Sequence, residues 1–309
     1  MQQPRLRIGT RGSALALAQA GEVRRRLMAA HGFAEADIEI VVIRTTGDRI
    51  QDRPLSEAGG KGLFTKEIEE ALLEGTIDLA VHSMKDMPTV LPEGLTIAAL
   101  LPREDVRDAF ISVKWLSIAA LPHGAVVGSS SLRRQAQLRR LRPDLQLVNY
   151  RGNVETRLNK LADGAVDATL LAVAGLNRLG LTDRITAAIS EDELLPAIAQ
   201  GAIGIECRFE DEDTSALLGA LNDASTALCV TAERAFLARL EGSCRTPIAG
   251  LGQLTGGIFT FRGEILTPDG RQSHATSRSG TPAAAVQLAT DAAEELLAKA
   301  GPGFFGANG

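Results

Sequence analysis

Two stretches of this chain repeat one order of predicted elements, and this repeat limits the fold more than any other feature. Residues 5–83 and residues 125–172 each contain a strand, a helix that begins at a serine, a second strand, a second helix and a third strand. Strands that alternate with helices are typical of parallel-rich α/β folds. We therefore expect two similar α/β lobes. The predicted elements are 5–10, 13–30, 38–48, 66–75 and 76–83 in the first stretch and 125–130, 131–142, 145–153, 154–164 and 165–172 in the second.

Short signatures at matching places support a duplication of this unit. Each match lies at the end of a predicted strand, at the start of a helix or just before a strand. The matching pairs are Gly9-Thr10 with Gly128-Ser129, Ser13 with Ser131, Gly47-Asp48 with Gly152-Asn153, Gly75 with Gly164, and Ile77-Asp78 with Val166-Asp167.

The chain is predicted to pass between the two lobes twice. Residues 100–110 form the first predicted crossing and residues 190–209 the return, with the apolar run after Gln200 forming another strand. Two crossings make a double hinge, and we expect lobes joined in this way to enclose a cleft for a ligand. The predicted first domain is 1–101 plus 200–219, and the predicted second domain is 105–195.

The sequence pattern changes after about residue 220, where a smaller third domain is predicted for residues 222–309. An amphipathic helix is predicted from Asp223 to Leu240, with Gly242 as its C-cap. Three short strands follow within 248–278, separated by glycine-containing turns. A final helix over 282–300 completes an α+β domain with a three-stranded antiparallel sheet.

Composition argues against several classes of protein. A net charge of -5 and an aromatic content of 4% argue against a nucleic-acid-binding surface, so any anion site must be a local cluster of basic residues. No run of about 18 apolar residues and no secretory signal is visible. The three cysteines are odd in number and widely spaced, which fits neither disulfides nor a zinc site. We therefore expect a cytoplasmic protein that needs no membrane, nucleic acid or metal ion.

Basic residues gather at the predicted ends of strands, where α/β lobes bind ligands beside helix N-termini. Arg133 and Arg134 occupy the first turn of a helix, where the helix dipole disfavours a cation. Because guanidinium groups pair well with planar carboxylates, we predict a polycarboxylate ligand. The alternative is that these basic residues are scattered surface charges that bind no common ligand. The set comprises Arg11, Ser13, Lys61 and Lys85 in the first lobe and Arg133, Arg134, Arg151, Arg157 and Arg178 in the second.

Arg139, Arg140 and Arg142 lie near the predicted C-terminus of the same helix. Cations are favourable at that end of a helix, so no ligand is needed to explain them. We expect these three side chains to be solvated, and Arg139→Ala to have little effect.

Asp86 follows Lys85 at the end of an apolar predicted strand. Surrounding cations would keep its carboxylate ionised, so that it could stabilise positive charge on a substrate or transfer a proton to a departing amine. A simple Lys–Asp turn in contact with solvent would account for the same residues.

The cysteines are of two kinds. Cys207 lies in a predicted strand and Cys229 in an amphipathic helix, where a cysteine is usually a small buried apolar residue. Cys244 instead follows a helix in a polar loop, and Arg245 beside it would favour the thiolate form. It is therefore a candidate nucleophile or covalent attachment point. A cysteine–histidine dyad is an alternative, although no histidine is adjacent in sequence.

Ordered blocks along essentially the whole chain resemble the porphobilinogen deaminase family, whose members are also called hydroxymethylbilane synthases. No single block is specific to this family, but the number of blocks and their order along the chain are specific to it. The blocks are RIGTRGSALALAQA, GGKGLFTKEIEEALLEGTIDLAVHSMKDMP, VVGSSSLRRQAQL, NYRGNVETRL, LAVAGLNRLGL, QGAIGIE and EGSCRTPIAG.

The resemblance implies a transferase of tetrapyrrole (haem) biosynthesis. Such an enzyme condenses four molecules of porphobilinogen head to tail, releases ammonia each time, and hydrolyses the product to hydroxymethylbilane. The chain grows on a dipyrromethane cofactor held by a thioether to a cysteine of the C-terminal loop, which Cys244 matches. The family fold has three domains, the first two similar to the lobes of two-domain anion-binding proteins. The resemblance also implies a monomer whose product passes to uroporphyrinogen III synthase.

The resemblance also implies roles for individual residues. Asp86 matches the catalytic aspartate, which holds pyrrole N–H groups and stabilises the cation left when ammonia departs. Lys61 and Phe64 match a loop that covers the active site, and Glu57 stands where relatives carry a lysine. The residues implied to bind the cofactor, besides Cys244, are Lys85, Asp86, Ser129, Ser131, Arg133, Arg134 and Gly152. Those implied to bind substrate or the elongating chain are Arg11, Ser13, Gln19, Arg151, Arg157 and Arg178.

Two other functions are weighed against this one. A non-catalytic, two-lobed anion-binding protein would share the fold but would have no use for Cys244. Nucleic-acid binding through residues 132–142 is opposed by the negative net charge and the few aromatic residues.

Overall fold

The computed structural model describes residues 5–49, 62–242, 246–301 and 303–305. These residues form two five-stranded sheets and one three-stranded sheet. The chain divides into two compact units, Met1–Glu104 with Gly201–Ala227 and Asp105–Gln200 with Leu228–Gly309. The boundaries at 104–105 and 200–201 fall inside the two predicted crossings. Because the second unit holds both the second lobe and the C-terminal segment, the division into three domains stays a prediction.

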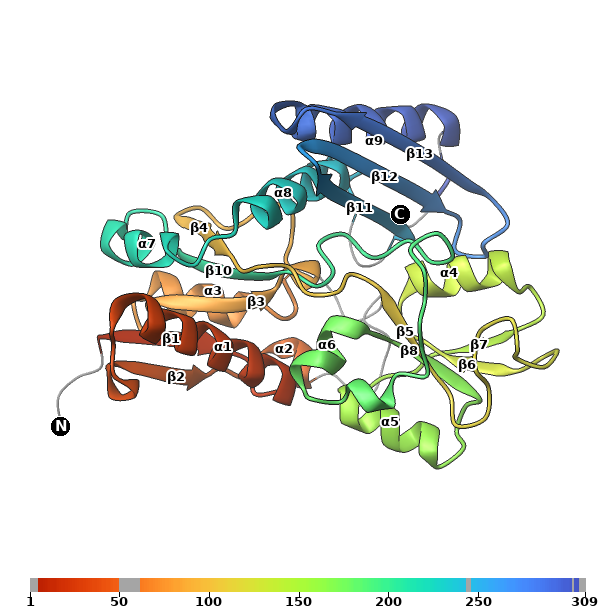
Figure 1. Cartoon of the computed structure of the whole chain (residues 1–309), viewed down its shortest axis with the longest axis horizontal. Helices are drawn as coiled ribbons and strands as arrows, with labels where there is room; N and C mark the ends of the chain where they lie inside the picture. The colour runs from red at the N-terminus through yellow and green to blue at the C-terminus, as the bar shows by residue number, and fades with distance from the viewer. Residues whose placement is uncertain (1–4, 50–61, 243–245, 302, 306–309) are drawn as a thin grey trace. The chain divides into compact units, whose positions relative to one another are not determined.

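The first lobe is built on one five-stranded sheet (Figure 1). Its strands are β1 (Leu6–Thr10), β2 (Ile38–Val42), β3 (Leu79–Ser83), β4 (Leu95–Leu100) and β10 (Ile203–Arg208). The strand order is β2-β1-β3-β10-β4. β1 runs parallel to β2 and β3, whereas β10 runs antiparallel to β3 and β4. The return crossing therefore supplies a strand in the interior of this sheet.

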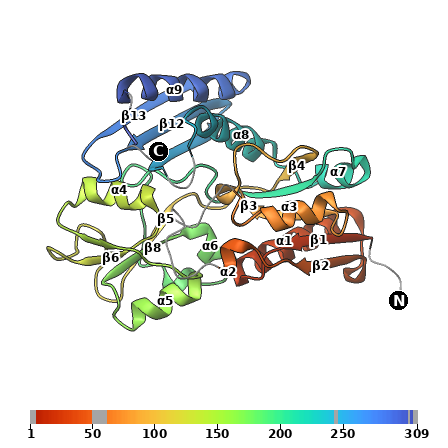
Figure 2. The same cartoon turned by 180° about the vertical axis from the view of Figure 1, so that it is seen from behind.

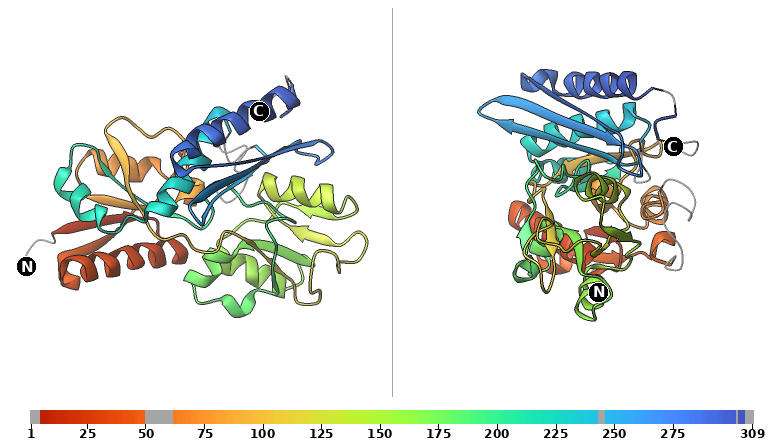
Figure 3. Two further views of the ribbon diagram at one scale, coloured as in Figure 1. Left: turned by 45° about the horizontal axis from the view of Figure 1, so that its top comes forward. Right: turned by 90° about the vertical axis from the view of Figure 1, so that its right-hand side faces the viewer.

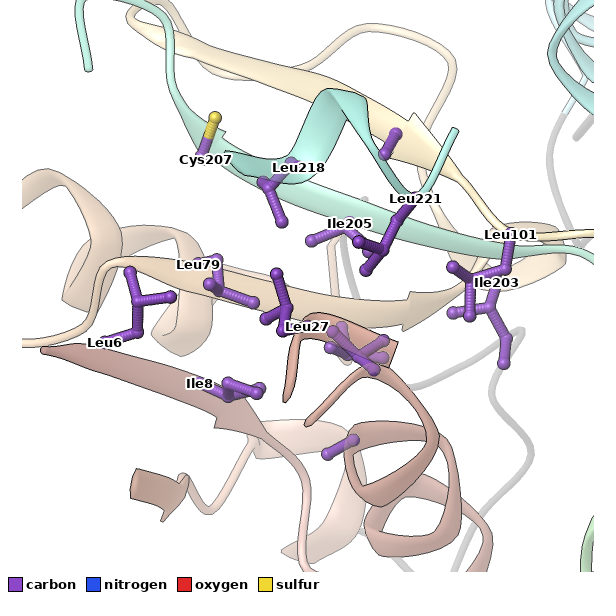
Figure 4. Packing of buried hydrophobic residues seen from close by; sticks show 14 of the residues in the cluster. Leu6, Ile8, Leu27, Leu79, Leu101, Ile203, Ile205, Cys207, Leu218 and Leu221 are labelled. Atoms are coloured by element: carbon purple, nitrogen blue, oxygen red, sulfur yellow. The ribbon is translucent and has the colours of Figure 1, made fainter. Parts of the chain in front are cut away.

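Helices cover both faces of the first sheet, and Figures 1 and 2 show α1 and α3 on opposite sides of it. The helical segments of this lobe are α1 (Ala14–His31), η1 (Glu35–Asp37), α2 (Thr46–Arg49), α3 (Lys66–Leu73), η2 (Met84–Asp86) and α7 (Glu212–Gly219). Leu27 of α1 and Leu218 of α7 belong to one buried apolar cluster, which also holds Cys207 (Figure 4). Ile68 and Leu72 of α3 belong to a second cluster. This two-sided core holds the strand ends in fixed positions.

The second lobe repeats this plan. Its strands are β5 (Asp108–Ile111), β6 (Val126–Gly128), β7 (Gln146–Val148), β8 (Ala168–Ala172) and β9 (Ala187–Ala188). The order is β7-β6-β8-β5-β9, with β6 parallel to β7 and β8, and β5 antiparallel to β8 and β9. β5 thus holds the place that β10 holds in the first lobe. The prediction of two similar α/β lobes is confirmed.

Helices also cover both faces of the second sheet. They are α4 (Leu132–Leu141), α5 (Val154–Ala162), α6 (Val173–Arg178) and the short η3 (Thr182–Arg184). Leu138 of α4 packs in one buried cluster with Phe110 of β5. Leu158 of α5 and Leu176 of α6 pack in another. The first turn of α4 carries two of the predicted site arginines, Arg133 and Arg134.

One backbone feature shows the duplication directly. The N–H of Asp78 donates to the carbonyl of Arg7 at 2.9 Å, and the Asp78 carboxylate accepts the N–H of Arg7 at 2.7 Å. Asp167 makes the same two bonds with Val126, each at 2.8 Å. In both lobes an aspartate just before the third strand thus fixes the start of the first strand. The predicted correspondence of Asp78 with Asp167 is confirmed.

Two predicted strands end five or more residues earlier than the sequence indicated. β2 ends at Val42, because residues 46–49 form the short helix α2. β7 ends at Val148, and Asn153 accepts the N–H of Thr156 at 2.8 Å to cap α5. In each lobe the residues after the second strand therefore turn instead of extending the sheet.

The C-terminal segment forms a sheet backed by a helix (Figure 3). Its elements are α8 (Ala224–Arg239), β11 (Ile248–Thr255), β12 (Ile258–Leu266), β13 (Ser273–Gly280), η4 (Pro282–Ala284) and α9 (Ala285–Ala300). The sheet order is β11-β12-β13 with antiparallel neighbours. Gly256 and Gly257, with φ of 58° and 77°, supply the two left-handed residues of the first hairpin turn. The predicted three-stranded antiparallel sheet is confirmed.

The end of α8 differs from the prediction. Glu241, and not Gly242, takes the left-handed conformation, with φ of 52°. The N–H of Gly242 donates to the carbonyl of Leu237 at 3.0 Å. Gly242 is closely packed: a Cβ there would lie 2.4 Å from the end of the Ile248 side chain and 2.6 Å from the end of the Leu237 side chain, so both would have to shift.

The second half of α4 contacts the C-terminal segment. Its arginines are partly exposed, in line with the prediction that they are solvated, but they also make contacts that the sequence did not indicate. Arg139 Nη1 donates to the carbonyl oxygen of Pro268 at 2.6 Å. Arg140 forms an ion pair with Glu264, which is buried on β12. Arg142 is bonded to carbonyl and carboxylate oxygens of its own lobe. Within the second unit, α4 thus joins the lobe to the sheet.

Candidate active site

The first half of the predicted site lies at one edge of the first sheet. Because β1 and β3 are parallel neighbours, their carboxyl ends meet at that edge. Arg11 and Ser13 follow β1, whereas Lys85 and Asp86 follow β3 within η2. Lys85 and Asp86 are exposed, and the neighbouring Met84 is buried. Each of these four residues follows a parallel strand of this sheet, as the sequence predicts.

Ser13, the N-cap of α1, and Gln19 within α1 form hydrogen bonds at this edge of the sheet. The Ser13 side chain accepts the N–H of Ala16 at 3.3 Å and so caps the helix. Gln19 is buried one turn further on and donates through Nε2 to the Ser83 hydroxyl at 2.9 Å. The Ser83 hydroxyl donates in turn to Gln19 Oε1 at 3.2 Å. Gln19 therefore fixes the end of β3 directly before the segment that carries Asp86.

Arg11 and Phe64 are brought together. The guanidinium carbon of Arg11 lies 4.2 Å from the centre of the Phe64 ring, in a cation–π contact. The ring also packs on Gly47, where a Cβ would lie 2.4 Å from it. Lys61, predicted to lie in the same loop as Phe64, and Glu57 fall outside the described residues.

The second half of the site lies at the matching edge of the second sheet. β6 is parallel to β7 and β8, so their carboxyl ends also meet. The buried Ser129 follows β6, and its hydroxyl accepts the N–H of Ser131 at 3.3 Å. The Ser131 hydroxyl in turn accepts the N–H of Arg134 at 3.4 Å and caps α4. The two serines thus set the direction in which the first turn of α4 points.

Arg133 and Arg134 are buried, so these two residues are not the scattered surface charge that was the alternative interpretation. Their side chains are 5% and 7% exposed, and both form ion pairs of 2.7 Å with Asp108, which is fully buried. Burial alone would raise the pKa of the Asp108 carboxyl. The charges of the two arginines and their hydrogen bonds outweigh burial and hold this pKa well below its usual value.

The residues that follow β7 form the third part of this edge. Gly152 has φ of 127°, and a Cβ there would lie 2.7 Å from the Thr156 side chain, so glycine is required. Arg157 Nε donates to the carbonyl of Gly152 at 2.8 Å. Arg151 precedes this turn, and Arg178 ends α6, the helix that follows β8. All the predicted residues of the second lobe thus follow parallel strands of one sheet.

The donors on Arg133 and Arg134 fit an anionic cofactor. Among the described residues, the buried Nε of each arginine has no hydrogen-bond partner. An unpaired buried N–H is costly, so such donors call for an acceptor. A carboxylate is the acceptor that a guanidinium pairs with best. A dipyrromethane built from an acidic pyrrole carries carboxylates of this kind.

The described cysteines are Cys207 and Cys229, and both are buried and not disulfide-bonded. Burial raises the pKa of the Cys207 thiol to about 11, so this sulfur stays protonated and unreactive at neutral pH. Cys244, the predicted attachment point, falls outside the described residues. In the part of the chain that the structure describes, no cluster of histidine, cysteine and acidic residues could hold a metal ion. No helix in that part is long and apolar enough to cross a membrane.

Two family models together match nearly the whole chain. Residues 6–216 match "Porphobilinogen deaminase, dipyromethane cofactor binding domain", and residues 227–298 match "Porphobilinogen deaminase, C-terminal domain". The chain belongs to the porphobilinogen deaminase family. The family resemblance predicted from the ordered blocks is therefore confirmed.

Relatives support the same family. The porphobilinogen deaminase of Paracoccus denitrificans (strain Pd 1222) is 62% identical over 300 residues, covering 97% of this chain and 96% of that protein. The porphobilinogen deaminase of Nitrobacter hamburgensis is 60% identical over 298 residues, covering 96% and 94%. Among solved structures, the periplasmic VFT2 domain of Bordetella pertussis BvgS has a TM-score of 0.41 and 18% identity, covering 73% of this chain and 90% of that one. A likeness at that level carries no argument about function.

Sequence reasoning missed three residues of the site. Ser83 fixes Gln19, Asp108 pairs with both buried arginines, and Gln200 donates to Asp108 at 2.9 Å. The signal for Asp108 is its place at the start of the apolar strand DAFI, where a carboxylate becomes buried and needs a cation. A buried anion of this kind indicates that some of the basic residues must lie inside the lobe.

Proposed function

We propose that this chain is a hydroxymethylbilane synthase of tetrapyrrole (haem) biosynthesis. It condenses four porphobilinogen molecules head to tail, releases four molecules of ammonia, and hydrolyses the product to hydroxymethylbilane. The observation that carries this proposal is the match of both porphobilinogen deaminase models, over residues 6–216 and 227–298. The site chemistry supports it, because the acetate and propionate arms of porphobilinogen make the product a polyanion that basic residues can bind.

The cofactor is a dipyrromethane, which supplies the two-pyrrole primer on which the chain grows. We propose that Cys244 carries it through a thioether. The two other cysteines support this assignment, because both are buried and neither can present sulfur to a ligand. Lys85, Ser129, Ser131, Arg133, Arg134 and Gly152 are proposed to bind the cofactor.

Asp86 is proposed as the catalytic residue, with its carboxylate stabilising the positive charge that develops as the amine of the substrate leaves. Its exposed position beside Lys85, after the parallel strand β3, supports this role. The proposed substrate-binding residues are Arg11, Ser13, Gln19, Arg151, Arg157 and Arg178. Lys61 and Phe64 are proposed to belong to a covering loop.

Three further points belong to the proposal. We propose a cytoplasmic monomer that passes hydroxymethylbilane to uroporphyrinogen III synthase. That neither Cys207 nor Cys229 is disulfide-bonded supports a reducing compartment. We also propose that the C-terminal segment, residues 222–309, is a third domain that carries the cofactor.

The test of the proposal is the intact mass of the purified protein together with a thiol count in denaturant. The sequence mass is 32.6 kDa and the chain has three cysteines. We expect the mass of two substrate-derived pyrroles in addition, and two titratable thiols instead of three. Cys244→Ser should carry no adduct and make no product, because a serine hydroxyl is a far weaker nucleophile than a thiolate.

The matched control is Cys229→Ala, which removes a buried thiol and should keep the adduct. Wild-type protein at its sequence mass, with three thiols and no product, would instead indicate a plain anion-binding protein. An adduct that persists in Cys244→Ser would show that another residue carries the cofactor.

A further inference from the structure

Asp108 lies between the two arginines that begin α4. Its carboxylate oxygen Oδ1 accepts a hydrogen bond from Arg134 Nη2 at 2.7 Å, and Oδ2 accepts one from Arg133 Nη2 at 2.7 Å. Gln200 Nε2 donates to Oδ1 at 2.9 Å and to the carbonyl of Val106 at 2.7 Å. The carboxylate is fully buried and therefore has a fixed position.

The other amino group of each arginine is held as well. Arg133 Nη1 donates to the carbonyl of Leu195 at 2.8 Å, and Arg134 Nη1 donates to the carbonyl of Leu170 at 2.9 Å. Each guanidinium is thus bound through both of its amino nitrogens, which fixes its plane. The Nε of each is buried and has no hydrogen-bond partner among the described residues.

The charges of this cluster do not balance. Two buried guanidinium groups and one carboxylate leave one positive charge inside the lobe. The charge of Glu264 also acts on Arg133, but Glu264 is itself paired with Arg140, so one positive charge remains. A buried charge without a partner is unfavourable, so the cluster requires a further anion. We propose that Asp108 is a positioning residue, which orients Arg133 and Arg134 so that their remaining N–H groups meet the carboxylates of the dipyrromethane. This inference rests on the proposed function.

A simpler account would treat the two arginines only as positive charge, with Asp108 reducing that charge. The two accounts predict opposite results for Asp108→Asn, which keeps the shape of the side chain and raises the charge of the cluster by one. If charge alone matters, the variant should attract an anion more strongly. If orientation matters, it should hold the anion less well, because an amide cannot accept from both arginines as a carboxylate does.

The experiment follows assembly of the cofactor by intact mass. Protein without adduct is incubated with graded concentrations of porphobilinogen, and the rate of mass gain gives a maximal rate and a half-saturating concentration. For Asp108→Asn we expect the rate at low porphobilinogen to fall at least tenfold, with a raised half-saturating concentration. Asp108→Glu keeps the charge and displaces the carboxylate by one methylene, so we expect the same direction of change. Circular dichroism establishes that each variant is folded, and either variant alone decides the question.

The matched control is Asp144→Asn. Asp144 pairs with Arg142 at 2.8 Å just after α4, so the substitution also removes an arginine–aspartate ion pair without touching the proposed site. It should load at the wild-type rate. A role in stability alone would lower the melting temperature of the Asp108 variants and leave the half-saturating concentration unchanged.

Folded Asp108→Asn or Asp108→Glu that loads as fast as wild type, or faster, would overturn the inference. The proposed function would survive that result, because wild-type protein would still carry the adduct and make product. Wild-type protein that never gains mass with porphobilinogen would instead refute the proposed function, and this inference with it.

Discussion

At the scale of single residues, burial separates the arginines of this protein into two groups. Arg133 and Arg134 lie inside the second lobe on the Asp108 carboxylate, whereas Arg11 stacks on the Phe64 ring near its strand end. The positions of these residues after strands could be predicted from the sequence. The burial of the pair could not, because it depends on Asp108, which is 25 residues away in sequence from Arg133 and becomes adjacent only in the folded lobe.

The proposed catalytic carboxylate gives the first prediction at this scale. Asp86→Asn should lower kcat at least 100-fold, because a neutral amide cannot stabilise a developing cation as a carboxylate does. The exposed position of Asp86 predicts an unchanged melting temperature. Asp163→Asn, at the exposed end of α5, serves as the control and should keep full activity. A wild-type kcat in Asp86→Asn would remove this residue from the mechanism.

The lowered pKa of Asp108 gives a prediction about pH. In the folded protein this carboxyl stays ionised, whereas in the unfolded chain it takes up a proton below a pH of about 4. Its contribution to stability is therefore present above that pH and is lost progressively as the pH falls. Asp108→Asn should be destabilised by about 3–5 kcal/mol at pH 7, because it leaves two buried cations unpaired. Urea unfolding should show the gap between wild type and variant narrowing below pH 4, and a gap independent of pH would contradict the assignment.

At the scale of elements, α4 has two functions. Its first turn carries the Asp108-bound arginines, and its last turns contact the C-terminal segment through Arg139 and Arg140. The sequence shows the same residue pair, Arg-Arg, at both ends of the helix. Rules based on the helix dipole predict neither the burial of the first pair nor the contacts of the second pair with the C-terminal segment. The helix itself, its serine cap and its amphipathic face could be predicted, because they depend on residues within the segment.

The ion pair between Arg140 and Glu264 provides the prediction at this scale. Burial raises the pKa of the Glu264 carboxyl, and the charge of Arg140 opposes that effect. Arg140→Ala would leave this carboxylate buried without its partner, so we expect a loss of about 1–3 kcal/mol in urea unfolding. Arg24→Ala breaks a surface pair with the exposed Glu35 and should cost no more than about 1 kcal/mol. Equal losses in the two variants would show that α4 is not held through Glu264.

At the scale of the whole molecule, the chain builds the same sheet order twice from different parts of itself. The first lobe receives β10 only after the entire second lobe has been passed in sequence. Alternating strands and helices made the lobes and the return strand predictable. The grouping of the C-terminal segment with the second lobe could not be predicted from the sequence. It depends on interactions between distant residues, such as the hydrogen bond of 3.0 Å that the Gly250 N–H donates to the Pro196 carbonyl.

The turn that ends α8 limits where a group bonded to Cys244 can go. Gly242 is fixed by its bond to Leu237, and the buried Pro247 leads directly into β11. Cys244 is two residues from Gly242 and two from Thr246 in the sequence, and both of these residues are described. The anchored end of an oligopyrrole would therefore be attached to a short segment of chain between two described residues. As rings are added, the free end of the oligopyrrole is the part that must occupy additional space.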